Sequence, residues 1–214
     1  EALGLARTKG YRNTLVLKFG TSLAGGIIDG QGRIAGGLNE ITGVVIDMRE
    51  DASQHPTTLV RGNAGGYVSF GGIVRLAGLL GLDRAEWLKG EPDLPRRLAL
   101  ELENAGSAHH AEAKAVYEGI GEYVADLALE LSGYYPVDRV VISGGVVAGR
   151  AGLVIAEKAQ SLVGRTMEFS RDDDETTLRY GALIGAAELA GEAIESGKSL
   201  GGPDQAAAGP RFYQ

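Results

Sequence analysis

Short apolar segments separated by turn residues open the chain. Thr14–Phe19 is a mostly apolar run that stops at Gly20, and Gly26–Asp29 and Arg33–Ala35 lie on either side of the turn Gly30-Gln31-Gly32. Short apolar runs bounded by glycine are typical of strands joined by tight turns. We therefore expect three consecutive strands in a meander.

The middle of the chain shows the spacing of helices instead. Ile73–Leu82, Arg84–Lys89 and Leu94–Glu103 have helical patterns, and prolines mark breaks near them. We interpret residues 70–107 as a helical insertion.

Helices and strands alternate in the second half. Between His109 and Ser132 the apolar residues recur every three or four positions, which predicts a helix with one buried face that ends at Gly133. The remaining predicted elements are strand Arg139–Ser143, helix Leu153–Val163, strand Thr166–Phe169 and helix Leu178–Glu195. This order predicts one α/β domain over residues 1–195, followed by a flexible tail at 196–214 that is rich in glycine, alanine and proline.

Composition excludes several classes of partner. The 214 residues carry a formal charge of -7 with scattered positive residues, so we do not expect nucleic acid to bind. No apolar run approaches the roughly 20 residues of a membrane span, and no signal-like segment opens the chain, so we expect a cytoplasmic protein without a membrane role. The absence of cysteine excludes disulfides and thiolate metal sites.

Glycine is the outlier in the composition. It occupies 34 of the 214 positions, about 16%, where roughly 7% is usual. Such a share indicates many tight turns or close approaches of the backbone to a ligand.

One glycine-containing turn follows the first predicted strand. In Phe19–Gly26, backbone N–H groups and the hydroxyls of Thr21 and Ser22 are able to point at an anion. The same residues suit a simple β-hairpin turn, in which glycine supplies positive φ. Taken alone, this segment does not decide between the two.

A second such turn, Ser143-Gly144-Gly145-Val146, follows a predicted buried strand about 120 residues later. A glycine pair at this place is also a common way to enter a helix. In open α/β sheets, however, ligands gather at the carboxyl ends of strands. Two turns of this kind therefore favour a shared cleft, and their residue types suit a nucleotide, with donors for phosphate and bare backbone for a flat base.

Other polar groups admit plainer interpretations. The small-residue face at Tyr180–Ala187 suits close packing, and we interpret that helix as a wall of the site. The acidic run Asp172–Glu175 is able to bind a cation, but it precedes the same helix, where capping is the preferred account. His55, His109 and His110 lack the spacing of a metal site, and no Ser/His/Asp nucleophile arrangement is visible.

Three segments resemble a known family. Gly10-Tyr11, Asn13 and LVLKFGTSLAGGIIDGQGRIAGGLNE resemble the second phosphate loop of the ROK (repressor, ORF, kinase) family, within the actin, Hsp70 and sugar-kinase superfamily. VVISGGV and RYGALIGAAELA resemble that family's adenosine motif and closing helix. The segments occur in the family's order with similar spacing, and the resemblance extends to about Ala190.

The resemblance implies a ribonuclease H-like, actin-like ATPase lobe that binds ATP with Mg²⁺. Gly20, Thr21 and Ser22 are then expected to face the phosphates, and Gly144 and Gly145 to lie against the adenosine.

The resemblance also implies a second lobe. The family's early aspartate-glycine-threonine phosphate loop and its general-base aspartate do not occur here, and Glu1 aligns just past the expected place of that aspartate. We therefore expect the chain to be the C-terminal lobe, to depend on a missing N-terminal lobe, and to associate with another chain, a homodimer being one option.

Several family positions are changed. Family kinases grip the sugar with a glutamate and a histidine that correspond to Val44 and Asp47 here, and Val68 stands where a further sugar-binding glutamate belongs. The family's zinc knot would fall at residues 61–68, which contain no cysteine, so no zinc is expected. Asn39, Glu40 and Asp47 remain candidates for substrate contact, although loop carboxylates are usually just solvated.

These observations lead to two functional hypotheses. The first is the ATP-binding lobe of a ROK-like phosphotransferase, a sugar kinase that transfers the γ-phosphate of ATP to a hydroxyl of a sugar or related polyol. The second is a degenerate, non-catalytic ROK-like domain that binds a ligand or regulates a partner. The changed sugar positions favour the second hypothesis, and the intact phosphate loop favours the first.

Overall fold

A four-stranded sheet organises the molecule. The computed structural model describes residues 4, 8–36, 40–55, 58–172, 183–187, 189–191 and 194. The strands are β1 (Thr14–Phe19), β2 (Leu23–Ile28), β3 (Arg139–Ser143) and β4 (Glu168–Arg171), in the spatial order β2-β1-β3-β4. β2 is antiparallel to β1, whereas β1, β3 and β4 are parallel to one another. This mixed sheet with helices confirms the predicted α/β class.

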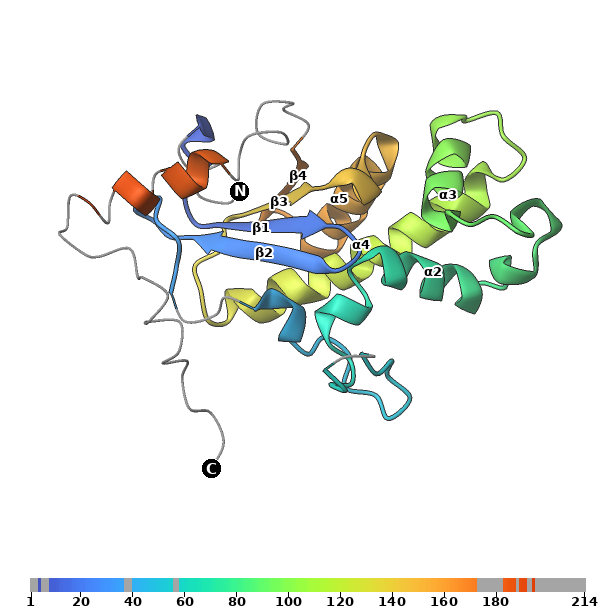
Figure 1. Cartoon of the computed structure of the whole chain (residues 1–214), viewed down its shortest axis with the longest axis horizontal. Coiled ribbons are helices and arrows are strands. Elements are labelled where there is room, and N and C mark those ends of the chain that lie inside the picture. The colour runs from blue at the N-terminus through green and yellow to red at the C-terminus, as the bar shows by residue number, and fades with distance from the viewer. Residues whose placement is uncertain are drawn as a thin grey trace.

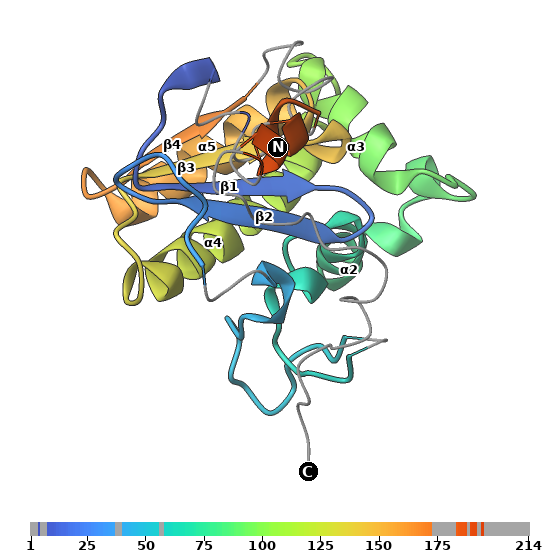
Figure 2. The same ribbon diagram turned by 60° about the vertical axis from the view of Figure 1, so that its left-hand side comes forward.

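The main core lies on one face of the sheet. Alternate residues of β1, namely Leu15, Leu17 and Phe19, belong to the same buried cluster as the apolar faces of two long helices. These helices are α4 (His110–Ser132) and α5 (Arg150–Val163), which pack against each other beside the sheet (Figures 1 and 2). Burial of alternate positions explains why the apolar run of β1 forms a strand at the centre of the sheet.

Two further helices lie beyond the carboxyl end of β1. They are α2 (Phe70–Leu79) and α3 (Leu94–Glu103), and Figure 1 shows both on the same side of the molecule. Side chains cap each of them, since Ser69 accepts a hydrogen bond from the Gly72 amide and Asp93 accepts one from the Arg96 amide. Five 3-10 turns complete the described part: η1 (Ile41–Gly43), η2 (Ala64–Gly66), η3 (Leu82–Arg84), η4 (Glu86–Leu88) and η5 (Gly145–Val147).

Most predicted elements exist, with shifted ends. β3 and α3 have the predicted bounds, and α4 differs from its prediction by one residue. β2 begins at Leu23 instead of Gly26, because Gly25 lets the strand pass close to the backbone of Val16 and the side chain of Ile41. The tail 196–214 and half of the predicted last helix lie outside the described residues, and the described positions of that helix, 183–187, 189–191 and 194, are helical.

Two predicted elements are wrong. The predicted third strand, Arg33–Ala35, forms only an isolated bridge between Ile28 and Ile34. The run is three residues long, and the chain leaves the sheet directly after it. The helix predicted at Arg84–Lys89 is replaced by η3 and η4, since Ala85 between them adopts an extended conformation.

Candidate nucleotide site

The two glycine turns meet at one edge of the sheet. β1 and β3 are parallel neighbours, so both turns leave the sheet at its carboxyl edge. Gly144 has a φ of 111°, and a Cβ there would lie 2.9 Å from the backbone nitrogen and carbonyl carbon of Phe19 and would overlap its carbonyl oxygen. Only glycine therefore allows the two turns to lie this close.

A pocket of about 580 Å³ joins these turns to helix α3. The β1–β2 turn contributes Gly20 and Thr21, and the segment after β3 contributes Gly145. The other lining residues are Phe19, Phe70, Asp93, Pro95, Arg96, Ala99, Leu100, Glu103, Val146 and Ala148. The structure thus brings Gly20, Thr21 and Gly145 to one cavity, although they are separated by more than a hundred positions in the sequence.

Backbone hydrogen bonds hold the first turn in place. The Gly20 amide donates to the Ser22 carbonyl at 3.1 Å, and the Gly20 carbonyl accepts from the Phe70 amide at 3.0 Å, which ties the turn to the start of α2. Thr21 and Ser22 are exposed. Ser22 belongs to this turn but does not line the pocket.

Helix α3 forms a wall that the sequence reasoning missed. Ala99 and Leu100 present apolar surface to the pocket, and Leu100 is 57% exposed. Asp93, Arg96 and Glu103 add charge to the same wall. The stripe at positions 96, 99, 100 and 103 was a readable signal, because residues three and four apart share one helix face.

A smaller hollow of about 310 Å³ shares Gly145 and Ala148 with this pocket. Gly144 lines it, as do the cationic side chains of Lys18 and Arg171. The hollow also includes Asp172, the first residue of the acidic run, which is buried. The rest of that run, residues 173–175, lies outside the described residues, so its predicted role as a helix cap stays a prediction.

Asp47 has a well-defined structural environment. Its carboxylate accepts two hydrogen bonds from the Arg49 guanidinium, at 2.9 and 2.7 Å, and one from the Tyr67 hydroxyl at 2.7 Å. Arg49 and the Tyr67 hydroxyl hold the pKa of Asp47 far below its usual value, against the opposing effect of burial. The Tyr67 hydroxyl accepts from the Ser53 amide at 2.9 Å, so this network fixes the surrounding loop.

The other side of Tyr67 is covered by a cation and a second ring. The Arg75 guanidinium lies 4.0 Å from the centre of the Tyr67 ring, and Tyr123 packs edge-on with a centroid separation of 4.8 Å. Burial and the hydrogen bond to Asp47 raise the pKa of Tyr67. Asp47 is therefore part of a packed structural cluster.

Among the remaining candidates, those that the structure describes do not line the pocket at the two glycine turns. The Glu40 carboxylate is exposed and accepts a hydrogen bond from the Thr42 hydroxyl at 3.0 Å. Val68 is fully buried, and Asn39 lies outside the described residues. Within the described ranges, no group of three or more His, Asp or Glu side chains is arranged to hold a metal ion.

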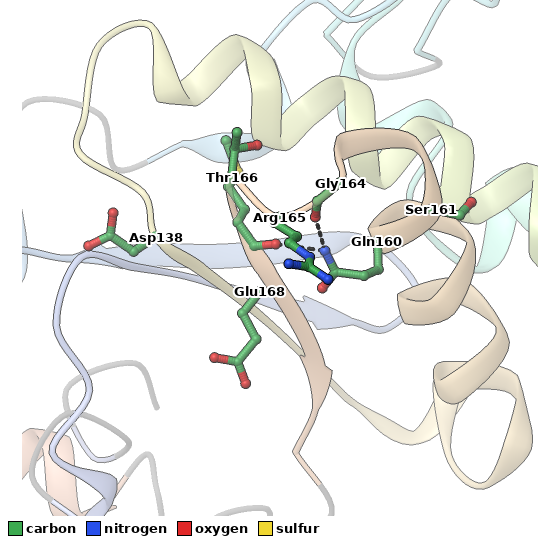
Figure 3. Close-up of a pocket in the computed structure, with 8 residues that line it drawn as sticks. Asp138, Gln160, Ser161, Gly164, Arg165, Thr166 and Glu168 are labelled. Carbon is green, nitrogen blue, oxygen red and sulfur yellow. Dashed lines mark hydrogen bonds between the residues drawn. The ribbon is translucent and has the colours of Figure 1, made fainter.

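A third hollow, of about 650 Å³, lies at the opposite end of the parallel strands (Figure 3). Asp138 precedes β3, and Arg165 and Thr166 precede β4. The Gln160 side chain is occupied by hydrogen bonds to backbone groups of Gly164, Met167 and Phe169. Because ligands of open α/β sheets gather at the carboxyl ends, the position of this hollow does not favour a nucleotide.

None of the helices that the structure describes combines the length and apolar character that a membrane crossing requires. Comparisons by sequence find nothing similar: no protein-family model matches the chain, and no curated protein matches it significantly.

Solved structures, in contrast, match the fold. The ROK hexokinase from Thermus thermophilus superimposes with a TM-score of 0.62 at 18% identity, covering 89% of this chain and 63% of the hexokinase. A ROK glucokinase from Streptomyces griseus, in complex with glucose and AMPPNP, gives 0.64 at 19% identity, covering 88% of this chain and 64% of that one. A ROK transcriptional regulator homologous to the E. coli MLC protein gives 0.64 at 16% identity, covering 87% and 49%.

These matches confirm the predicted resemblance at the level of the fold. The chain spans between 49% and 64% of the length of these three neighbours, which corresponds to one lobe of a larger architecture. The protein therefore has the actin-like fold of a lobe found in ROK-family sugar kinases and regulators.

Proposed function

We propose that this chain is the ATP-binding lobe of a ROK-like phosphotransferase, a sugar kinase that transfers the γ-phosphate of ATP to a hydroxyl of a sugar or related polyol. The observation that carries this proposal is the single pocket shared by Gly20, Thr21 and Gly145, with Gly144 against the Phe19 backbone. A neighbour of the same fold holds glucose and AMPPNP, which supports ATP and a sugar as the ligands.

The pocket has the parts that a nucleotide needs. The turn at Gly20, Thr21 and Ser22 offers a hydroxyl and backbone groups to phosphates. The opposite side offers bare backbone at Gly144 and Gly145 and apolar surface at α3, which suit adenosine. The adenosine and the phosphates would thus lie on different parts of the same edge of the sheet.

Mg²⁺ would enter with the nucleotide. It binds proteins through one or two carboxylates plus substrate phosphates and water, so the absence of a larger carboxylate group among the described residues is compatible with it. Its chemistry would be to neutralise charge on the phosphates.

Catalysis would need groups beyond this lobe. In phosphoryl transfer, positioning and a base that orients the acceptor hydroxyl supply much of the rate. We place that base and the first phosphate loop in the part of the neighbours' fold that this chain does not cover. Residues 1–195 would then act as one lobe that closes on a second.

The nucleotide site is tested by the double variant Thr21→Val with Gly145→Leu. A Cβ at Gly145 meets no atom within 4 Å, so leucine is tolerated by the fold but fills the pocket. We expect calorimetric titration to show no ATP binding. Gly78→Leu, on the outside of α2 with equally open space, is the matched control and should bind as the parent does. Unchanged ATP affinity in the double variant would exclude this site.

A specific observation favours the non-catalytic alternative. Asp47, at a sugar-gripping position of the resembled family, is held by Arg49 and Tyr67, and Val68, at another, is buried. A domain that binds another ligand or regulates a partner, without transferring phosphate to a sugar, has such positions free to change.

Turnover separates the two functions. ATP consumption with a panel of sugars should be compared for residues 1–214 and for the complete gene product. We expect the kinase only in the complete product, because loss of a general base alone costs about 10²- to 10⁴-fold in rate. Acceptor-dependent turnover by residues 1–214 would refute the one-lobe proposal, whereas ATP binding without turnover in the complete product would favour the regulatory function.

A further inference from the structure

Helix α5 begins without a cap of its own. Its N-cap residue is Gly149, no acidic residue lies in its first turn, and its first residue is Arg150. The cap comes from another helix: Glu103, 47 positions earlier, accepts a hydrogen bond from the Arg150 amide at 2.6 Å through Oε1. A Cβ at Gly149, whose φ is 64°, would overlap the same oxygen, so glycine makes room for the carboxylate.

Glu103 is also part of the candidate nucleotide pocket. It is the last residue of α3 and lines the cavity one turn beyond Ala99 and Leu100. Val146 and Ala148, which line the facing wall, immediately precede α5. The Glu103 carboxylate therefore connects the α3 wall of the pocket to the start of α5. The same part of the pocket carries the apolar surface of these two walls.

This position has an electrostatic consequence for an anionic ligand. The first amides of a helix attract anions, but at α5 the carboxylate of Glu103 already accepts from the first of them, the Arg150 amide. A phosphate placed there would lose the Arg150 amide as a donor and would be repelled by a like charge. The hydroxyl and backbone groups of Gly20 and Thr21 carry no such charge.

We infer that Glu103 is a specificity-determining residue that keeps phosphate groups away from the α5 end of the pocket. It thereby directs a nucleotide to bind with its nucleoside against α3 and its phosphates at the β1–β2 turn. This inference rests on the proposed nucleotide site. It adds to that site a residue whose charge sets the direction of the ligand.

The test is Glu103→Gln, measured with ADP and with adenosine as separate ligands of the complete gene product. Glutamine keeps an oxygen that can accept from the Arg150 amide but removes the charge. We expect the dissociation constant of ADP to fall about fivefold, since the Glu103 residue is exposed and solvent screens the repulsion. Adenosine affinity should stay within about twofold, because adenosine carries no phosphate.

Glu86→Gln is the matched control for net charge. Glu86 is an exposed acid that pairs with Lys89 and does not line the pocket, so its loss should leave both ligands unchanged. If Glu103→Gln has the same ratio of ADP to adenosine affinity as the parent, the inference is overturned. An equal weakening of the binding of both ligands would also overturn it, because that result indicates a purely structural cap. Failure of the parent chain to bind either ligand would remove the nucleotide site itself, and this inference with it.

Discussion

Two regions of the molecule are held by different means: the edge of the candidate nucleotide pocket and the loop at residues 44–69. Residues 56 and 57 of this loop lie outside the described residues. At the pocket edge, Gly20 and Gly144 are placed by strand pairing and backbone contacts. The described part of the loop has the 3-10 turn η2 and isolated backbone bridges, and a hydrogen-bond network among the side chains of Asp47, Arg49 and Tyr67 adds to them.

This difference explains why the two regions depart differently from the resembled family. A backbone-built edge requires glycine at particular points but makes few demands on other side chains. A loop that is tied by a side-chain network depends on the identity of the residues in that network. Asp47 belongs to such a network, so its carboxylate has a structural role. The pocket edge can therefore keep the resembled pattern while the loop changes.

The largest expected effect comes from breaking the backbone-built edge. Gly144→Val should lower the free energy of unfolding by at least about 3 kcal/mol, because φ is positive and the new side chain would overlap the Phe19 carbonyl. Urea unfolding would measure this. Gly145→Ala, one residue later in open space, should change stability by less than about 1 kcal/mol. Similar losses in both variants would contradict the special role of Gly144.

A smaller effect is expected from breaking the side-chain network. Asp47→Asn should cost about 2 kcal/mol, less than a fully buried pair would, because Arg49 remains exposed to solvent. Asp51→Asn in the same loop is the control, since Asp51 is itself largely exposed and lies 4.0 Å from Arg49. Equal stability of the two variants in urea would show that the network does not hold the loop.

The same network predicts a dependence of stability on pH. The folded-state pKa of Asp47 is depressed from its ordinary 3.8, so its stabilisation is present above about pH 4 and is lost as the pH falls towards the folded value. The parent should therefore lose stability faster than Asp47→Asn below pH 4, and their unfolding free energies should converge. Parallel curves in acid would assign the stabilisation to other groups.

The smallest expected effect is that of metal removal. If the backbone bridges and the side-chain network hold the loop without a metal ion, a chelator should leave the melting temperature unchanged, and mass spectrometry should find no stoichiometric zinc. One tightly held zinc per chain would mean that ligands outside the proposed network organise this region.

Local pattern predicted the elements whose burial repeats regularly. α4 buries residues at three- and four-residue spacing and β3 has an apolar centre at residues 140–142, so their bounds were readable. The helix prediction at Arg84–Lys89 was wrong because the composition of this segment suits a helix, whereas Ala85 is extended in the structure. The α3 wall was missed because its function depends on what it faces, and Leu100 looks like an ordinary apolar helix residue until it is found exposed.

The sequence by itself determined that glycine turns follow two strands and that the chain alternates helices and strands, because turn chemistry and apolar periodicity act over a few neighbouring residues. Only the tertiary structure decided that these turns share a pocket, that Glu103 caps a helix 47 positions away, and that Asp47 bonds to Tyr67. The shared pocket depends on the parallel pairing of β1 with β3, and the Glu103 cap on the packing of α3 against α5. Each of the three contacts joins residues whose separation in the sequence leaves no local pattern.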